Sequence, residues 1–216
     1  MQKLENVRKF PGFNRRLKEF KNTGSSFGNI EAMILFYLMD YIDFCGHNKP
    51  YGGNTIKIDR TFKNTMINAL CITDGNISKA LNKFYKAGVL YKIKNGLYQL
   101  NPWLAAKGRD ADVIWLRRYG VFKEYVIGQN TTVFRDKYDI LKIIQEDALS
   151  DEQLENGETD GLNKAQVLEI YRMLESIKLL TSQEISALMN HTFEFPKNRQ
   201  GNFLKSLFTK NNSHTS

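Results

Sequence analysis

The sequence predicts a mainly α-helical protein that contains a winged helix-turn-helix domain, with a β-hairpin as the wing, and a C-terminal helical region. Two observations within residues 55–102 carry this prediction. Two stretches with apolar residues at helical spacing are separated by only three residues. The periodicity then changes from 3.6 to 2 on either side of an Asn-Gly pair. Helix, short turn, helix and hairpin in this order are typical of a winged helix-turn-helix.

The second of these helices is predicted over residues 73–87. Apolar residues recur at steps of three and four along one face: Ile77, Ala80, Leu81, Phe84 and Gly88. Thr73 is a good N-cap, because its hydroxyl can accept a hydrogen bond from a backbone N–H of the first turn. Gly88 is expected to end the helix, because glycine adopts the left-handed C-cap conformation without a Cβ penalty.

The first helix is predicted over residues 61–70, and the hairpin follows the second helix. The first helix carries Phe62, Met66, Ile67 and Leu70 at helical spacing. The three residues from Cys71 to Thr73 form so short a connection that the two helices must cross steeply. Downstream, Asn95-Gly96 between alternating runs predicts a hairpin with a type I′ turn, which needs positive φ at both central residues.

The exposed side of this unit is strongly basic. Between Arg60 and Lys94 there are seven basic residues and one acid, Asp74, a net charge of +6. Opposite the apolar face, the second helix carries polar groups and lysines: Asn76, Ser78, Lys79, Asn82, Lys83 and Lys86. Helices of this kind place their N-terminal residues on base edges in the major groove and leave the phosphates to flanking lysines. We therefore predict binding to double-stranded DNA; the alternative is a solvated face on an ordinary pair of helices.

The predicted DNA contacts fall into two groups. The residues expected to read base edges are Asn76, Ser78, Lys79 and Asn82. Thr73, at the start of the same helix, also belongs to the predicted interface. The residues expected to contact phosphates are Arg60, Lys83, Lys86, Lys92 and Lys94.

One part of this unit supports a family resemblance. The run ITDGNISKALNKFYKAGVLYKIKNGLYQLNPWLAAKG resembles the Firmicute plasmid replication protein (RepL) family, whose winged helix ends in a similar hairpin, a Leu-Asn-Pro and a short stretch to a glycine. The matching residues here are Leu100, Asn101, Pro102 and Gly108, followed by an aromatic-rich run that ends in Tyr119-Gly120. The resemblance covers about residues 30–120 and implies a plasmid replication initiator or its regulator.

The winged domain is predicted to span residues 29–120, after a basic N-terminal arm at 1–28. The arm fits two interpretations: a segment that follows the DNA backbone or enters a minor groove, or a short solvated helix docked by its phenylalanines. Residues 29–44 predict a helix that is apolar nearly all round, which indicates burial on more than one face. This helix is either the first helix of the winged domain alone or a dimer seam as well. A further helix is expected at 110–119, ended by Gly120.

The rest of the chain predicts connecting helices at 121–148, an acidic linker at 149–161 and a C-terminal helical domain at 162–216. The stretch 145–161 holds seven acids and no base, which is typical of a solvated linker. Beyond it we predict three helices. The first spans 163–179, the second begins with a capping box at Thr181–Glu184, and the third lies near 203–208. This domain is expected to recruit host replication proteins or to form a homodimer; a second, degenerate helix-turn-helix is the alternative.

Composition bounds the partners of the protein. Residues 1–120 hold 20 basic and 9 acidic residues, a net of +11, whereas residues 121–216 hold 11 and 14, a net of −3. The surface that binds a polyanion is therefore expected in the first part. The longest apolar run, Ala32–Met39, is far below the roughly twenty residues that span a bilayer, and no signal peptide opens the chain. We expect a cytoplasmic protein with no membrane partner, and Cys45 and Cys71 as small buried residues rather than a disulfide.

The sequence offers no recognisable catalytic or metal-binding pattern. Its histidines, His47, His191 and His214, are widely separated, so the closely spaced histidine pair that holds the metal of a tyrosine-dependent nicking enzyme does not occur; His47 is predicted as a loop residue. No phosphate-binding GxxxxGK[ST] loop occurs either. We predict a protein that is not an enzyme, without cofactor or metal. The predicted function is plasmid replication initiation at the origin; the alternatives are a winged-helix transcriptional regulator and, less favoured, a DNA-nicking enzyme.

Overall fold

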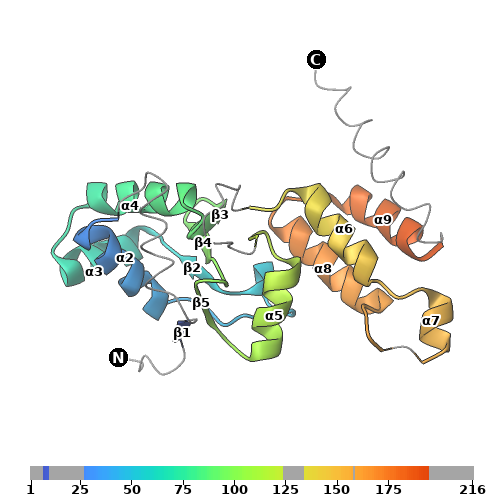
Figure 1. Ribbon diagram of the computed structural model, residues 1–216. Helices are drawn as coiled ribbons and strands as arrows, with labels where there is room; N and C mark the ends of the chain where they lie inside the picture. Colours follow the sequence, from blue (N-terminus) through green and yellow to red (C-terminus); the bar gives the residue numbers. More distant parts are fainter. Residues whose placement is uncertain (1–6, 10–26, 124–133, 158, 195–216) are drawn as a thin grey trace, which may run out of the picture. The chain divides into compact units, whose positions relative to one another are not determined.

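The computed structural model describes residues 7–9, 27–123, 134–157 and 159–194 (Figure 1). The chain forms two compact units, residues 1–134 and 135–216, which are described separately. The described residues are mostly helical, with one small three-stranded antiparallel sheet, as the predicted fold class requires at this coarse level. The predicted arm, apart from residues 7–9 and 27–28, and the predicted helix near 203–208 lie outside the described residues.

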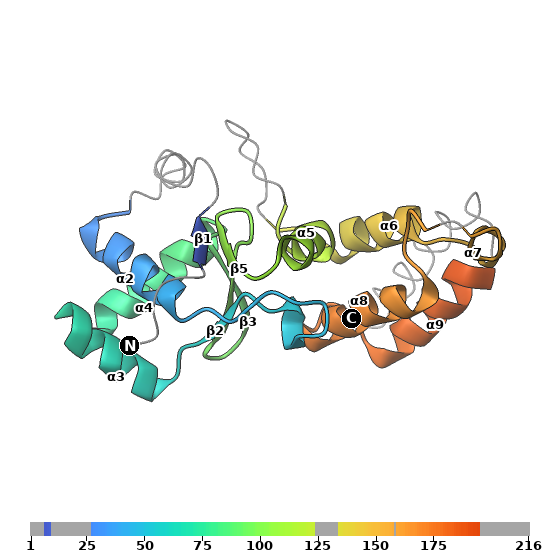
Figure 2. The ribbon, with the colours of Figure 1, turned by 90° about the horizontal axis from the view of Figure 1, so that it is seen from below.

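The described part of the first unit contains the helices α2 (Asn29–Asp40), α3 (Arg60–Leu70), α4 (Asp74–Lys86) and α5 (Asp110–Tyr119). Helices α2, α3 and α4 lie together in the views of Figures 1 and 2. They share one core with the sheet, in which Met66, Ile77 and Phe84 are fully buried. The short α3–α4 connection contains Cys71 in the left-handed conformation, with φ of 52°. The two predicted helices and the turn between them are thus confirmed as local structure.

Helix α2 differs from its prediction in length and burial. It ends at Asp40 rather than at residue 44, and it buries one side only, formed by Ile34, Leu35, Leu38 and Met39. A second buried face is not formed within the described part of this single chain, where Ile30 and Met33 remain 41% and 44% exposed. Burial of that face in a dimer seam stays a prediction. Within the described ranges, the core that α2 covers lies on the side of the helix that faces α3 and α4.

The sheet consists of β2 (Thr55–Lys57), β3 (Leu90–Lys94) and β4 (Leu97–Leu100), in the order β2-β4-β3. Strand β2 pairs antiparallel with β4, with Ile56 opposite Tyr98. A separate pair joins β1 (Val7–Lys9) to β5 (Ala105–Lys107), and a short 3₁₀ turn, η1, spans Pro50–Gly52. The strands β1, β2 and β5 escaped prediction because three residues are too few to display an alternating pattern.

The predicted hairpin is present, but its turn is not of the predicted type. Of the two central residues, only Gly96 has a positive φ, of 73°, so type I′ is wrong. The register instead shifts between Lys92, which pairs with Tyr98, and Lys94, which pairs with Leu97. A bulge of this kind increases the local strand twist, so the hairpin closes without a primed turn.

Two buried asparagines attach the hairpin to the rest of the unit. The Asn54 amide donates to the carbonyls of Leu100 and Ala105, at 2.8 and 3.1 Å, and no part of the residue is exposed. The Asn101 amide donates to the carbonyl of Gly88 at 2.9 Å, directly after α4. These bonds give the buried side-chain amides and the carbonyls partners, and they fix the hairpin relative to α4.

The second unit contains α6 (Lys137–Asp147), α7 (Asp151–Glu155), α8 (Lys164–Ser176) and α9 (Ser182–Glu194). The predicted capping box is confirmed: the Thr181 N–H donates to the Glu184 carboxylate at 2.8 Å, and the Glu184 N–H donates to the Thr181 hydroxyl at 3.2 Å. Lys137 reaches the same carboxylate at 2.6 Å, which joins α6 to α9.

The acidic segment 149–161, predicted as a linker, lies inside this second unit. It contains α7, and its ends meet where the Leu149 N–H donates to the carbonyl of Leu162 at 2.9 Å. Both leucines are buried, so the ends of the segment are anchored in the core of the unit.

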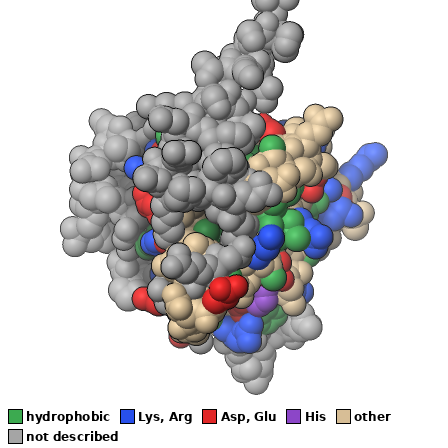
Figure 3. Space-filling view, turned by 90° about the vertical axis from the view of Figure 1, so that its right-hand side faces the viewer, with side chains coloured by type: hydrophobic (Ala, Val, Ile, Leu, Met, Phe, Trp, Pro, Cys, Tyr) green, Lys and Arg blue, Asp and Glu red, His purple; other side chains and the backbone are tan. Residues whose placement is uncertain are grey.

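Figure 3 shows one face of the molecule, on which both acidic and basic side chains are visible among the coloured atoms.

The two cysteines are both free, as predicted, but differ in environment. Cys45 is buried, and this burial raises the pKa of its thiol to about 12. Cys71 is exposed, so its predicted burial is wrong. It is the C-cap of α3 and has the left-handed backbone conformation.

Candidate nucleic-acid interface

The start of α4 is fixed by a reciprocal capping arrangement. The Asn76 N–H donates to the Thr73 hydroxyl at 3.2 Å, and the Thr73 N–H donates to the Asn76 side-chain oxygen at 3.0 Å. Thr73 thus acts as the predicted N-cap. Because its oxygen is held in this box, Asn76 is less able than an unengaged asparagine to offer both amide atoms to a base.

Helix α4 separates buried and exposed residues along the predicted line. Its apolar face, formed by Ile77, Ala80, Leu81 and Phe84, is buried. On the other side, Ser78, Lys79, Asn82 and Lys86 are exposed, and Asn76 and Lys83 are partly exposed. The structure therefore brings the predicted base-reading residues onto one accessible side of one helix.

Lys83, predicted as a phosphate contact, is engaged in an ion pair. Its ammonium bonds the carboxylate of Glu31, which also accepts a hydrogen bond from the Gly28 N–H at 2.8 Å and so caps α2. The hydrogen bond from Lys83 is the largest cause that lowers the pKa of Glu31 below its ordinary value. Since the pair neutralises one positive charge at the edge of α4, Lys83 is less available for a phosphate contact than the sequence predicts.

The other predicted phosphate contacts lie on α3, at the end of α4, where Lys86 is exposed, and on the hairpin. Arg60 is exposed at the first position of α3, and Lys92 is exposed on β3. The Lys94 ammonium donates to the Tyr51 hydroxyl at 3.1 Å and lies 5.5 Å from the centre of that ring. Lys63 forms an ion pair with Asp74 across the helix turn at 3.1 Å. The +6 charge counted along the sequence is thus partly compensated in the fold.

Two grooves run along α4, one on each side. The larger, of about 680 Å³, lies between α4 and the hairpin and is lined by residues that include Ser78, Tyr85 and Lys92. The smaller, of about 250 Å³, lies between α4 and the start of α2 and includes Glu31 and Lys79. Asn82 lines both grooves, so it stands on the ridge between them.

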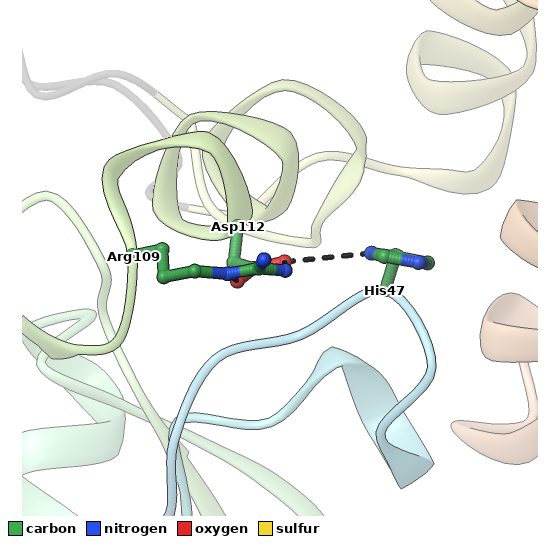
Figure 4. Close-up of polar contacts among 3 residues, drawn as sticks. All are labelled: His47, Arg109 and Asp112. Atoms are coloured by element: carbon green, nitrogen blue, oxygen red, sulfur yellow. Dashed lines mark hydrogen bonds and ion pairs between the residues drawn. The ribbon is translucent and has the colours of Figure 1, made fainter.

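His47, predicted as an ordinary loop residue, takes part in a cluster at the start of α5. The Asp112 carboxylate accepts from Arg109 Nε at 2.8 Å, and His47 Nδ1 lies 3.4 Å from its other oxygen (Figure 4). Asp112 is only 6% exposed. Hydrogen bonding from Arg109, and to a lesser extent from His47, lowers the pKa of Asp112. The cluster attaches the loop before η1 to α5; sequence analysis could not find it, because His47 and Asp112 are 65 positions apart.

Replacement of Asp112 by Asn is expected to flatten the acid dependence of stability. Because the folded-state pKa of Asp112 is lowered, its ionised carboxylate stabilises the fold above the unfolded pKa of about 3.9, and this contribution disappears as the pH falls through the folded value. The midpoint of thermal unfolding between pH 5 and pH 3 should therefore fall less steeply in Asp112→Asn than in the wild type. The exposed Asp160→Asn variant should keep the wild-type slope; equal slopes in all three proteins would contradict the expectation.

Within the described ranges, no three His, Cys, Asp or Glu side chains are grouped so as to hold a metal ion. None of the helices in those ranges is long and apolar enough to cross a membrane.

Comparison with known proteins provides no relative: no protein-family description, curated protein or solved structure matches the chain.

Proposed function

We propose that the chain is a winged helix-turn-helix protein that binds double-stranded DNA sequence-specifically, with α4 in the major groove. The observation that carries this proposal is the exposed side of α4, where polar groups and lysines stand opposite a fully buried apolar face. The short turn from α3 and the adjacent basic hairpin give this helix the setting in which such helices enter a groove. Lys86, Lys92 and Arg60 are the proposed contacts to the phosphates.

Within this interface, we assign base reading chiefly to Asn82 and Lys79, with Ser78 beside them. Asn82 stands on the ridge between the two grooves, where an amide can meet a base edge in the bidentate manner used for adenine. Lys79 lies one turn before it on the side of the smaller groove. Asn76 has a lesser role, because its oxygen is bound to Thr73.

The biological role that we propose is plasmid replication initiation at the origin. It is supported by the sequence resemblance over residues 30–120, and a transcriptional regulator with the same DNA-binding surface is the second candidate. In either case the second unit would bind host replication proteins or mediate self-association.

A gel-shift titration tests DNA binding directly. The purified protein is mixed with fragments of its own coding region and flanking DNA at increasing salt. One fragment bound tightly, with affinity that falls steeply with salt, is the expected result. Equal weak binding to all fragments would reject sequence-specific recognition.

Two further assays separate the candidate roles. If the protein allows a plasmid that lacks its own replication gene to replicate, it is an initiator. If it relaxes supercoiled plasmid in the presence of Mg²⁺, it nicks DNA.

Replacement of Glu31 by Gln is expected to strengthen binding to all DNA alike. Glutamine can still accept the hydrogen bond from the Gly28 N–H, so the cap of α2 is retained, while the charge that neutralises Lys83 is removed. The released ammonium should add about one phosphate contact and steepen the salt dependence by about one. Affinities for matched and mismatched duplexes at several salt concentrations measure this. Glu146→Gln, on the second unit, is the control that should leave the slope unchanged; an unaltered slope in Glu31→Gln would contradict the expectation.

A further inference from the structure

The groove between α4 and the hairpin has an aromatic lining that phosphate contacts do not explain. Tyr85 comes from α4, and Tyr91 and Tyr98 come from β3 and β4. Leu81 and Ile58 add apolar surface to the lining. The groove volume of about 680 Å³ falls within the range of about 300–1,000 Å³ that is usual for sites of small organic groups.

Two of these tyrosine rings pack against a further aromatic ring. The ring of Phe134 lies 5.5 Å from that of Tyr85 and 5.2 Å from that of Tyr91, between ring centres. Phe122 packs against Phe134 in turn, at 5.5 Å. Tyr85 is nevertheless 42% exposed, so it offers ring surface to the solvent. Rings supported in this way lose little conformational freedom when a ligand stacks on them.

The charges at the groove favour an anion. Lys63 and Lys92 line it, and the lining residues that belong to the described part of the chain include no carboxylate. Lys63 is paired with Asp74, whereas Lys92 is exposed. A ligand that combines a flat aromatic group with a negative charge therefore matches the groove on both counts.

We propose that this groove binds an unpaired nucleotide of single-stranded DNA, with its base stacked on Tyr85 and its phosphate beside Lys92. The inference rests on the proposed function, because it adds a second DNA site next to α4. A duplex backbone alone would gain nothing from the tyrosine rings, and the bases of an intact duplex are stacked inside it. An unpaired base, in contrast, gains stacking energy on an aromatic ring whatever its identity.

The test measures single-strand binding by fluorescence anisotropy, with a fluorescein-labelled oligothymidylate of 12 nucleotides and the full chain. Tyr85→Ala is expected to weaken binding of this probe about tenfold, the effect of losing one stacked base. Tyr85→Phe keeps the ring and should stay within twofold of the wild type. Tyr41→Ala removes a similarly exposed tyrosine, 53% exposed and outside the groove, and should have no effect.

The same variants are titrated with the duplex fragment that the wild type binds best, which separates this inference from the proposed function. Tyr85→Ala should change duplex affinity by less than twofold. Unchanged oligothymidylate affinity in Tyr85→Ala, or an equal loss on duplex and single strand, would overturn the single-strand site while leaving duplex recognition standing. Single-strand binding that depends on Tyr85, in a protein that binds all duplexes equally, would support this site and reject the proposed function.

Discussion

Asn54→Ala is expected to lower the free energy of unfolding by about 3 kcal/mol, the largest stability effect that we anticipate for a single polar side chain. The change removes two hydrogen bonds to the carbonyls of Leu100 and Ala105, and one that the Asn54 oxygen accepts from the Lys107 N–H at 3.4 Å. These groups are buried or partly buried, so water cannot fully replace the lost partner. Asn54 also has φ of 55°, a left-handed conformation that alanine adopts at a cost. Urea unfolding at neutral pH measures the loss.

Asn54→Gly is the matched variant, because glycine loses the same hydrogen bonds but adopts positive φ freely. It should be more stable than Asn54→Ala by about 1 kcal/mol, the left-handed penalty of a residue with a Cβ. If both variants lay within 0.5 kcal/mol of the wild type, roughly the size of an ordinary surface substitution, the proposed attachment of the hairpin through Asn54 would be wrong.

The role of Asn54 shows why sequence analysis stopped at the local elements. Helices α3, α4 and α5 and the hairpin could be predicted because their apolar spacing, caps and turn residues lie within the elements themselves. Asn54 bonds residues 46 and 51 positions away, and no local pattern marks such partners. The same holds for β2, whose three residues become a strand only because β4 lies beside them.

For the candidate interface, too, the sequence predicted which residues share one side of a helix but not which distant residues contact them. The spacing of residues along α4 was enough to place Lys79 and Asn82 on one exposed side. The ion pair between Lys83 and Glu31 was not, because the two residues are 52 positions apart and meet only through the packing of α2 on α4. The aromatic groove likewise needs the hairpin folded beside α4 before its tyrosines converge.

Asn82→Ala and Lys79→Ala are each expected to cost about 1 to 3 kcal/mol of discrimination between the specific site and a site with one base pair changed. The physical reason is that a side chain hydrogen-bonded to a base edge stabilises the complex only when that base is present. Both residues are exposed on α4, so the substitutions should leave the fold intact. Competition titrations with the specific duplex and each single-pair variant measure the discrimination.

Lys92→Ala provides the contrast that makes this test decisive. Lys92 is a proposed phosphate contact on the hairpin. Its removal should weaken binding to every duplex equally, and the slope of the salt dependence should become shallower by about one. Base readers and phosphate contacts therefore differ in kind: the first change the ratio of two affinities, and the second change both affinities together. If Asn82→Ala lowered all affinities in parallel, as Lys92→Ala should, α4 would bind the DNA backbone and base reading would have to come from another element.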